Sequence, residues 1–221
     1  MAERAAELLT AERIERLRSV ADSRLGCLTA VYDGLHNERN VSACLRSSEA
    51  FGLQHVHLVS TDTYRAHKAI ARGADRWLTV HRHAEPASCT DTLHAEGYTI
   101  WGTALEDGAE SVFDLPLPPR LAIMVGSEHD GLSAEARAGC DRLVIIPMSG
   151  FTQSLNVSTA VTVLLQYLAL AYRRELGDAA LLPPAEREAL YRQWLQRDVD
   201  RRLREKKPRS PHNRRAQRNI P

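Results

Sequence analysis

Glycine is scarce and widely spaced in this sequence. The 221 residues include 12 glycines, and no two of them lie two positions apart. This spacing excludes the GxGxxG fingerprint of dinucleotide-binding proteins, and equally the GxGxG loop of ordinary nucleotide-binding methyltransferases. The sequence also lacks a GxxxxGK[ST] phosphate loop and a GxSxG nucleophile elbow. Standard oxidoreductases, nucleotide hydrolases and serine hydrolases are therefore disfavoured.

Long apolar runs are also missing. None reaches the roughly 20 residues that a helix needs to span a bilayer. The N-terminal stretch MAERAAELLTAERIERL is charged and lacks the apolar centre of a signal peptide. Apolar residues nevertheless make up 43% of the chain, which is enough to build a core. We therefore expect a soluble, cytoplasmic protein with one domain of ordinary size plus appendages.

Metal-binding patterns are absent from the sequence. No CxxC pair occurs, and no set of cysteines and histidines has zinc spacing. Two histidine pairs, His55 with His57 and His81 with His83, each fall on one side of an extended segment. A metal site needs a third ligand, which the sequence does not nominate, so we predict none. The cysteines are expected to be buried thiols; they are Cys27, Cys44, Cys89 and Cys140.

Charge is distributed unevenly. The net charge is +1, but residues 201–221 contain nine Lys or Arg and a single acid, Glu205. A basic tail on a near-neutral body favours an anionic partner, often nucleic acid. A solvated terminus without a partner is the alternative. We expect the last residues, PRSPHNRRAQRNIP, to be disordered.

Helical and strand patterns alternate along the middle of the chain, and several of the strands are continuously apolar. This alternation is typical of an α/β fold with a mainly parallel sheet covered by helices on both faces. Beyond Gly177, prolines end one element and begin a further helix. The predicted strands are 27–35, 55–60, 77–80, 98–105, 121–125 and 142–148. The predicted helices are 10–24, 38–52, 86–97, 133–140 and 154–175.

Three polar loops follow predicted strands. They are GLHNERN (34–40), GSEHDGLS (126–133) and PMSGFTQSLN (147–156), and all are rich in Gly, Ser and Asn. In open α/β sheets, ligands bind outside the carboxyl ends of the strands. We therefore expect the functional site where these loops meet.

The first loop leads into NVSACLRSS, where Asn40 or Ser42 is predicted to cap a helix whose free N–H groups suit an anion. Arg46 is expected on the first turns of that helix. A guanidinium there can grip a phosphate with two parallel hydrogen bonds, and Asn40 is near enough to orient it. The alternative is an ordinary surface arginine.

The second and third loops carry further candidates. In MVGSEHDGLS, Gly126 lets a ligand approach the backbone, and Glu128 lies in the turn, where simple solvation is the alternative role. In GFTQSLNVSTAV, Ser154 is predicted to cap the last core helix, and Asn156 faces away from its buried side. Backbone groups of residues 146–148 are candidates to bind an adenine edge, with Ser154 and Asn156 acting on a second substrate.

Together these segments resemble the SpoU/TrmH branch of the SPOUT RNA ribose 2′-O-methyltransferases. NVSACLRSSEAFG, IMVGSEHDGLS and IIPMSGFTQSLNVSTA are similar to its three motifs, in the same order. The resemblance implies a C-terminal deep trefoil knot, a rare feature that periodicity alone would not propose. It also implies a SPOUT methyltransferase domain at 25–176. An N-terminal helical extension (1–24) and a C-terminal helix with a basic tail (177–221) look like those of the tRNA branch.

The resemblance further implies S-adenosylmethionine, held bent by the knot loops, and an obligate homodimer with the site near its interface. It gives Arg46 the catalytic position, with Asn40 orienting it. The residues that shape the site would be Glu128, Ser154 and Asn156. The cofactor contacts would be Thr103, Gly126, Ile146, Met148 and Leu155.

The implied reaction moves a methyl group to a ribose 2′-oxygen of tRNA, at a D-loop guanosine in the most similar branch. The run REKKPRSPHNRRAQRN is more basic than expected for that branch, so ribosomal RNA is kept as an alternative substrate. A knotted RNA-binding protein without catalysis is a further alternative, disfavoured by the intact site residues. Basic side chains that fit phosphate contacts are Arg13, Arg16, Arg201, Arg202 and Arg204.

Overall fold

The computed structural model describes residues 2–60, 73, 75–106 and 108–206. The described chain divides into two compact units. One consists of α1 (Ala2–Leu8), α2 (Ala11–Asp22) and α7 (Pro184–Lys206), and the other spans residues 23–183. The tail predicted to be disordered, residues 208–221, lies outside the described residues. Among those residues, no helix is long and apolar enough to cross a bilayer.

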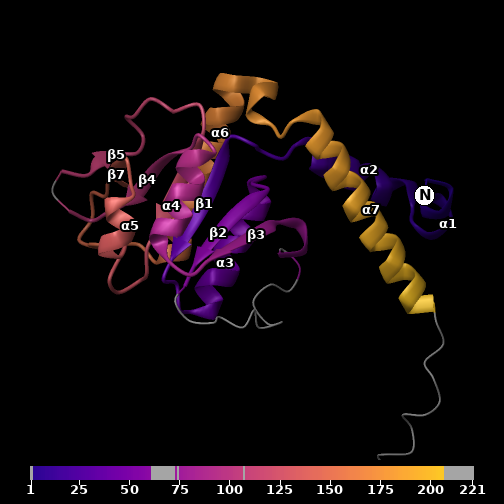
Figure 1. Ribbon diagram of the computed structural model, residues 1–221, viewed down its shortest axis with the longest axis horizontal. Coiled ribbons are helices and arrows are strands. Elements are labelled where there is room, and N and C mark those ends of the chain that lie inside the picture. Colours follow the sequence, from indigo (N-terminus) through magenta and orange to yellow (C-terminus); the bar gives the residue numbers. More distant parts are fainter. Residues whose placement is uncertain (1, 61–72, 74, 107, 207–221) are drawn as a thin grey trace, which may run out of the picture. The chain divides into compact units, whose positions relative to one another are not determined.

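The larger unit is built on a seven-stranded sheet in which every pair of neighbouring strands is parallel (Figure 1). The strand order is β3-β2-β1-β6-β4-β7-β5. This arrangement confirms the parallel sheet expected from the apolar strands. The strands are β1 (Leu28–Asp33), β2 (His55–Val59), β3 (Thr79–His83), β4 (Thr99–Thr103), β5 (Glu110–Ser111), β6 (Leu121–Val125) and β7 (Arg142–Ile145).

Helices cover both faces of this sheet, as predicted. Successive strand residues point to opposite faces, so Tyr32 and Ile123 join one buried cluster while Val31 and Met124 join the other. The first cluster packs under α3 (Glu38–Ala50) and α6 (Val157–Leu176). The second packs under α4 (Pro86–Ala95) and α5 (Ala134–Ala138). Burying each large side chain contributes about 1.5–3 kcal/mol.

Both predicted helix caps are wrong by a few residues. Helix α3 is capped by Asn37, whose Oδ1 accepts from the Arg39 backbone N–H at 2.9 Å, so neither Asn40 nor Ser42 caps it. Asn37 has the extended backbone that a cap requires. With the helix beginning at Glu38, Arg46 lies in its third turn rather than its first turns.

Helix α6 is capped by Asn156, not by Ser154. The Asn156 Oδ1 accepts from the backbone N–H of Ser158 at 2.9 Å and from the Ser158 hydroxyl at 2.6 Å. Strand β7 also ends at Ile145, three residues earlier than expected. An irregular connection therefore runs from Ile146 to the start of α6, and Ser154 lies within it.

Smaller differences concern short elements. The segment expected as a strand at 77–80 begins in a 3-10 turn, Asp75–Trp77, and β3 follows it. Elements α1 and β5 were not predicted, because seven and two residues show too little periodicity. Helix α3 ends at Ala50, two residues before the end of the predicted range, and Gly52 just beyond it has φ +87°, as is common for a glycine that follows a helix.

Candidate active site

A cavity of about 550 Å³ opens at the carboxyl ends of the neighbouring strands β6, β4 and β7. It is lined by residues 103–106, 125–132, 144–146, 148 and 154–157, together with Arg137 and Ala160. Its size falls within the range of small-molecule sites. Two of the three loops singled out in the sequence thus meet at one cavity, joined by the connection that follows β4.

All five residues expected to contact a cofactor line this cavity. They belong to three separate loops, and their exposure ranges from the buried backbone of Gly126 to a Leu155 side chain that is 37% exposed. The apolar side chains supply surface for a flat or aliphatic ligand, while the loops around them supply polar groups. The five are Thr103, Gly126, Ile146, Met148 and Leu155.

Gly126 occupies a position that no other residue can fill. A Cβ there would lie 2.0 Å from the carbonyl carbon of Gly131 and 2.2 Å from the Leu132 nitrogen. The loop is folded back this tightly because Ser127 and Gly131 exchange backbone hydrogen bonds of 2.9 and 3.1 Å. Gly131 adopts φ +70°, which glycine tolerates without strain. The backbone of this loop therefore forms part of the cavity wall.

The connection between β7 and α6 leaves its main chain available. Among the described residues, no backbone–backbone hydrogen bond involves positions 147–155. Buried or ligand-facing N–H and C=O groups need hydrogen-bond partners, so this loop offers main-chain donors and acceptors to a bound molecule. This observation fits the expectation that backbone groups near Met148 bind the edge of a planar ring.

Three predicted site residues form one polar network at the cavity. The Asn40 Nδ2 donates to Glu128 Oε1, and the Asn156 Nδ2 donates to Asn40 Oδ1 at 3.4 Å. The network joins α3, the loop after β6 and the first residue before α6. Glu128, Asn156 and Ser154 line the cavity, while Asn40 contacts it through Glu128.

Arg46 does not pair with Asn40 in this structure. Six residues along a helix place two side chains roughly 120° apart around the axis, so their directions diverge. The amide of Asn40 is used by Glu128 and Asn156 instead. Arg46 is exposed, and no ion pair or hydrogen bond joins its side chain to another residue in the described part of the chain. Its guanidinium is thus presented to solvent.

One charged pair at the cavity was not predicted. Arg137 on α5 donates from both terminal nitrogens to the two carboxylate oxygens of Glu106, each at 2.7 Å. Both residues line the cavity. In the sequence they look like ordinary surface charges on a short helix and a loop. Only the fold brings them together, so no sequence signal identifies them.

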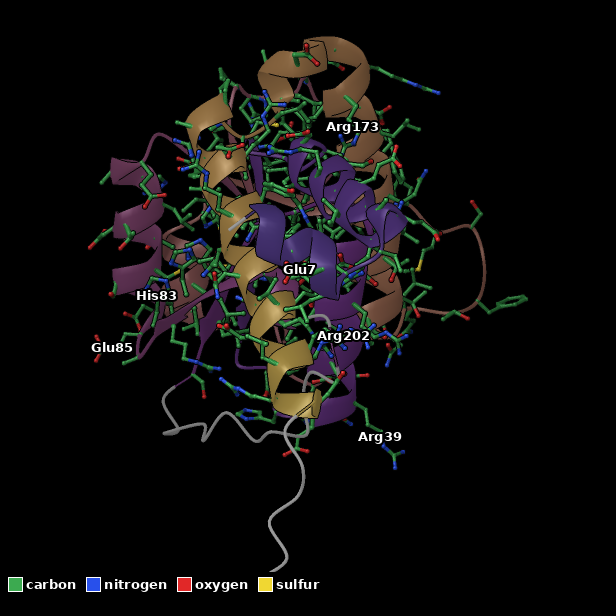
Figure 2. The ribbon with its side chains drawn as sticks, turned by 90° about the vertical axis from the view of Figure 1, so that its right-hand side faces the viewer. Glu7, Arg39, His83, Glu85, Arg173 and Arg202 are labelled. Atoms are coloured by element: carbon green, nitrogen blue, oxygen red, sulfur yellow. The ribbon has the colours of Figure 1, made fainter. Side chains whose placement is uncertain are left out.

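A second cavity lies within the unit of α1, α2 and α7. It measures about 330 Å³, and four of the five predicted phosphate-binding arginines line it. Arg13 also forms an ion pair with buried Asp198 at 2.7 Å, whereas Arg16 is exposed. Figure 2 shows Arg202 projecting from the last turns of α7. The lining arginines are Arg13, Arg16, Arg201 and Arg202.

Comparison with known proteins places this geometry in context. Residues 28–166 match the sequence model of the SpoU rRNA Methylase family. The chain is 32% identical to the tRNA (guanosine(18)-2′-O)-methyltransferase of Borreliella burgdorferi, over 83% of this chain and 84% of that protein. The crystal structure of the A. aeolicus TrmH/SpoU tRNA modifying enzyme superposes with a TM-score of 0.75 at 28% identity. That match covers 85% of this chain and 97% of the other.

A further similar structure contains a ligand. It is the SpoU methyltransferase AviRb from Streptomyces viridochromogenes, solved in complex with the cofactor AdoMet. The match has a TM-score of 0.61 and 28% identity, and it covers 69% of this chain and 60% of that chain.

Proposed function

Because this chain belongs to the SpoU rRNA methylase family, we propose that it methylates a ribose 2′-hydroxyl of tRNA, with S-adenosylmethionine as the methyl donor. The target is a D-loop guanosine. The observation that carries this proposal is the single cavity lined by all five expected cofactor residues, with Glu128 and Asn156 at the same cavity. Family membership also implies the trefoil knot predicted from the sequence.

The extent of the similarity favours tRNA over ribosomal RNA as the substrate. The relative from B. burgdorferi, named for guanosine 18 of tRNA, matches this chain over 83% of its length. The A. aeolicus enzyme matches over 85%, which reaches beyond the methyltransferase domain. The arginine-lined cavity of α1, α2 and α7 then supplies phosphate contacts outside the active site.

The residues of the cavity fit the proposed methyl donor. Gly126 removes the side chain that would block close approach, and the unpaired backbone of 147–155 offers hydrogen bonds to a nucleoside. Ile146, Met148 and Leu155 add apolar surface. When bound, S-adenosylmethionine supplies a methyl group already activated on a sulfonium. The protein therefore has to align the hydroxyl with that methyl group and help it lose its proton.

Arg46 is the proposed catalytic residue, although a guanidinium is a poor general base because it stays protonated in proteins. Its fork-shaped guanidinium can bind the phosphate next to the target ribose and hold the hydroxyl in place. The hydroxyl proton then passes to phosphate or to water. The exposed position of Arg46 suits this role, since RNA has to reach it from solvent.

The Asn40–Glu128–Asn156 network is proposed to position groups at the cavity. Asn40 acts by holding Glu128 and Asn156 in place, which replaces the direct orientation of Arg46 suggested by the sequence. Glu128 and Ser154 then provide polar atoms that face the ribose. Since Asn156 also caps α6, the position of this helix and the geometry of the site are coupled.

A homodimer completes the proposal. Two large apolar side chains on loops at or beside the cavity are strongly exposed: Phe151 at 108% and Leu105 at 63%. Apolar surface of this kind, rimmed by polar residues, is typical of an interaction site. A second copy of the chain that covers these side chains would place the interface next to the active site.

The test is tritium transfer from labelled S-adenosylmethionine to an unmodified tRNA transcript, with ribosomal RNA and an Arg46→Ala variant in parallel. We expect label in tRNA that disappears in the variant, and nuclease mapping that locates it on a D-loop guanosine. Label only in ribosomal RNA would keep the chemistry and overturn the substrate. Failure of the protein to bind S-adenosylmethionine would favour an RNA-binding protein without catalysis.

A further inference from the structure

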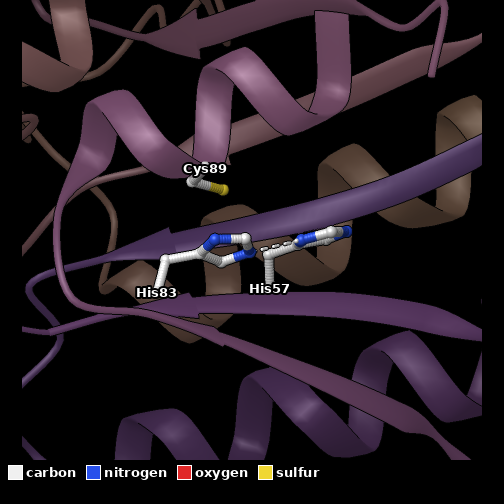
Figure 3. Close-up of side chains that lie close together, drawn as sticks. All are labelled: His57, His83 and Cys89. Carbon is white, nitrogen blue, oxygen red and sulfur yellow. Dashed lines mark hydrogen bonds between the residues drawn. The ribbon is translucent and has the colours of Figure 1, made fainter. Parts of the chain in front are cut away.

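Three potential metal ligands converge near the β2–β3 edge of the sheet. His57 of β2, His83 of β3 and Cys89 of α4 each offer a nitrogen or sulfur atom, and these atoms lie within 4.8 Å of one another (Figure 3). His57 is 3% exposed and Cys89 is fully buried, whereas His83 is half-buried. None of the three lines the methyltransferase cavity.

The fold aligns the two histidine pairs that the sequence predicted to share strand sides. In the parallel register His57 lies opposite His81, and Val59 lies opposite His83. Side chains two residues apart share a face, so the rings of both strands form one stack. The ring centroids are 4.6 Å apart between His57 and His81, and 5.3 Å between His57 and His83.

Helix α4 supplies the third ligand that the sequence did not nominate. It begins at Pro86, only three residues after His83 ends β3, and packs back onto the same face of the sheet. Figure 2 places His83 and Glu85 on the segment that leads into this helix. The turn of the chain brings Cys89 over the histidine rings, a proximity that no spacing rule for zinc motifs would recognise.

The spacing of the donor atoms is close to that of a metal site. The His57 Nδ1 and the His83 Nε2 share a hydrogen bond of 3.0 Å. Two nitrogens bound to one tetrahedral ion at about 2.0–2.1 Å lie roughly 3.3 Å apart. A tetrahedral ion lies off the line between the two nitrogens, so both rings have to turn toward it, and the Cys89 sulfur approaches from the helix above.

The chemical type of the three groups suits a metal ion. An imidazole nitrogen binds a metal through its lone pair, and the Cys89 thiol releases its proton when an ion binds. Two imidazoles and one thiolate match the ligand preference of Zn²⁺.

We propose that His57, His83 and Cys89 form a Zn²⁺ site, with water in the fourth position on the exposed side of His83. The ion would tie α4 to the β2–β3 edge of the sheet. The stacked ring of His81 holds His57 in orientation without binding the metal. This role would be structural and separate from methyl transfer.

The competing explanation is that Cys89 is a small apolar residue, packed with Val31, Leu93 and Met124 in the second hydrophobic cluster. The two explanations differ in one measurable respect. Only a metal site produces thiolate ligation at Cys89.

The experiment uses the full chain, stripped of metal with a chelator and titrated with Co²⁺ alone. We expect a near-ultraviolet thiolate-to-cobalt charge-transfer band that saturates at one ion per chain and disappears when Zn²⁺ is added. Cys89→Ser should remove the band, and the matched control Cys140→Ser, which alters a thiol outside the cluster, should retain it. Zn²⁺ should also raise the thermal unfolding midpoint of the wild type.

A second variant tests the site without replacing the buried Cys89, so the result does not depend on whether Cys89→Ser folds. His83→Gln changes the half-buried ligand and should weaken Co²⁺ binding by roughly 10- to 100-fold or more while the protein stays folded. The absence of the band in the wild type would overturn the site. So would a band that persists in Cys89→Ser, or Co²⁺ affinity that is unchanged in His83→Gln.

Discussion

Arg46 is the single residue on which the proposed chemistry depends most. Arg46→Lys retains the positive charge but lacks the planar fork that binds phosphate and hydroxyl together. We expect the single-turnover rate of methyl transfer to fall by about 100-fold or more, while affinity for S-adenosylmethionine is unchanged. Arg39→Lys is the matched control, because Arg39 is an exposed arginine on the same helix that points away from the body (Figure 2).

The result distinguishes a requirement for the planar guanidinium, which binds phosphate, from a requirement for positive charge alone. Near-wild-type turnover in Arg46→Lys would contradict the proposed role of the guanidinium. A loss of equal size in Arg39→Lys would show instead that the effect is not specific to position 46, since both substitutions keep the positive charge.

Arg24 has a structural role that the sequence did not reveal. Its side chain is fully buried and donates to the backbone oxygens of Glu49 and Leu53 at 3.1 and 2.8 Å, and to the Glu49 carboxylate at 2.7 Å. Arg24→Ala should lower the free energy of unfolding by about 3–5 kcal/mol, because buried partners lose their donor. Glu49→Gln should cost less, since both backbone acceptors stay satisfied. Urea denaturation measures the difference, and equal losses would contradict this explanation.

At the residue scale, the expected cofactor contacts came from the resemblance to a known family, and their roles stay predictions. Thr103, Gly126 and Met148 lie at or beyond the carboxyl ends of strands and line one cavity. Asn40 and Arg46 lie six residues apart on one helix, which directs their side chains roughly 120° apart around its axis. Nearness in the sequence therefore did not reveal that they diverge.

Among the elements, the loop after β6 is the most tightly constrained. Gly126→Ala would place a Cβ 2.0 Å from backbone atoms of Gly131, so the loop has to open. We expect calorimetry to detect no binding of S-adenosylmethionine by this variant. Gly150→Ala is the control in a neighbouring loop, because its nearest neighbour to an added Cβ is 3.9 Å away. Undiminished affinity in Gly126→Ala would contradict the assignment of this loop to the cofactor.

Helix α6 offers a test of coupling between stability and activity. Asn156→Ala removes the cap and should lower the free energy of unfolding by about 1 kcal/mol, with loss of methyl transfer. Asn156→Asp keeps an oxygen for the cap but has no N–H to donate to Asn40. It should therefore keep its stability and still lose activity. Thermal unfolding and initial rates measure both effects, and full activity in Asn156→Asp would exclude a role for the amide.

The elements themselves were largely predictable, and their ends were not. Strand β6 spans the predicted residues 121–125, because a run of five apolar residues indicates a strand buried on both faces. The start of α6 was misplaced because Ser154 and Asn156 are both good caps. What decides between them is the path of the preceding loop, which depends on its contacts within the fold.

For the whole molecule, the basic surface predicts how RNA binding depends on salt. Each phosphate contact releases a counterion, so Arg16→Gln and Arg202→Gln should each reduce the slope of log K against log salt concentration by about 1. Arg192→Gln is the control on α7, because Arg192 pairs with Glu188 outside the arginine-lined cavity. Filter binding of tRNA across a salt series measures the slopes. An unchanged slope in both variants would exclude this cavity as a phosphate site.

Composition and alternation were enough to predict a parallel α/β sheet, but not its strand order. The sheet places β6 beside β1, although β2, β3, β4 and β5 come between them along the chain. Such pairing depends on packing between distant segments, which periodicity does not encode. The proximity of Cys89 to two histidines was missed for the same reason.

The way the polar network spans the chain also bears on how the protein folds. Asn40 is 88 residues from Glu128 and 116 residues from Asn156, and closing loops of this length is slow. The cavity therefore depends on contacts between distant segments of the chain, as the β1–β6 pairing of the sheet does. A ligand that binds there recognises only completed molecules and stabilises them by mass action. Binding of S-adenosylmethionine during refolding would thus report the fraction of completed molecules.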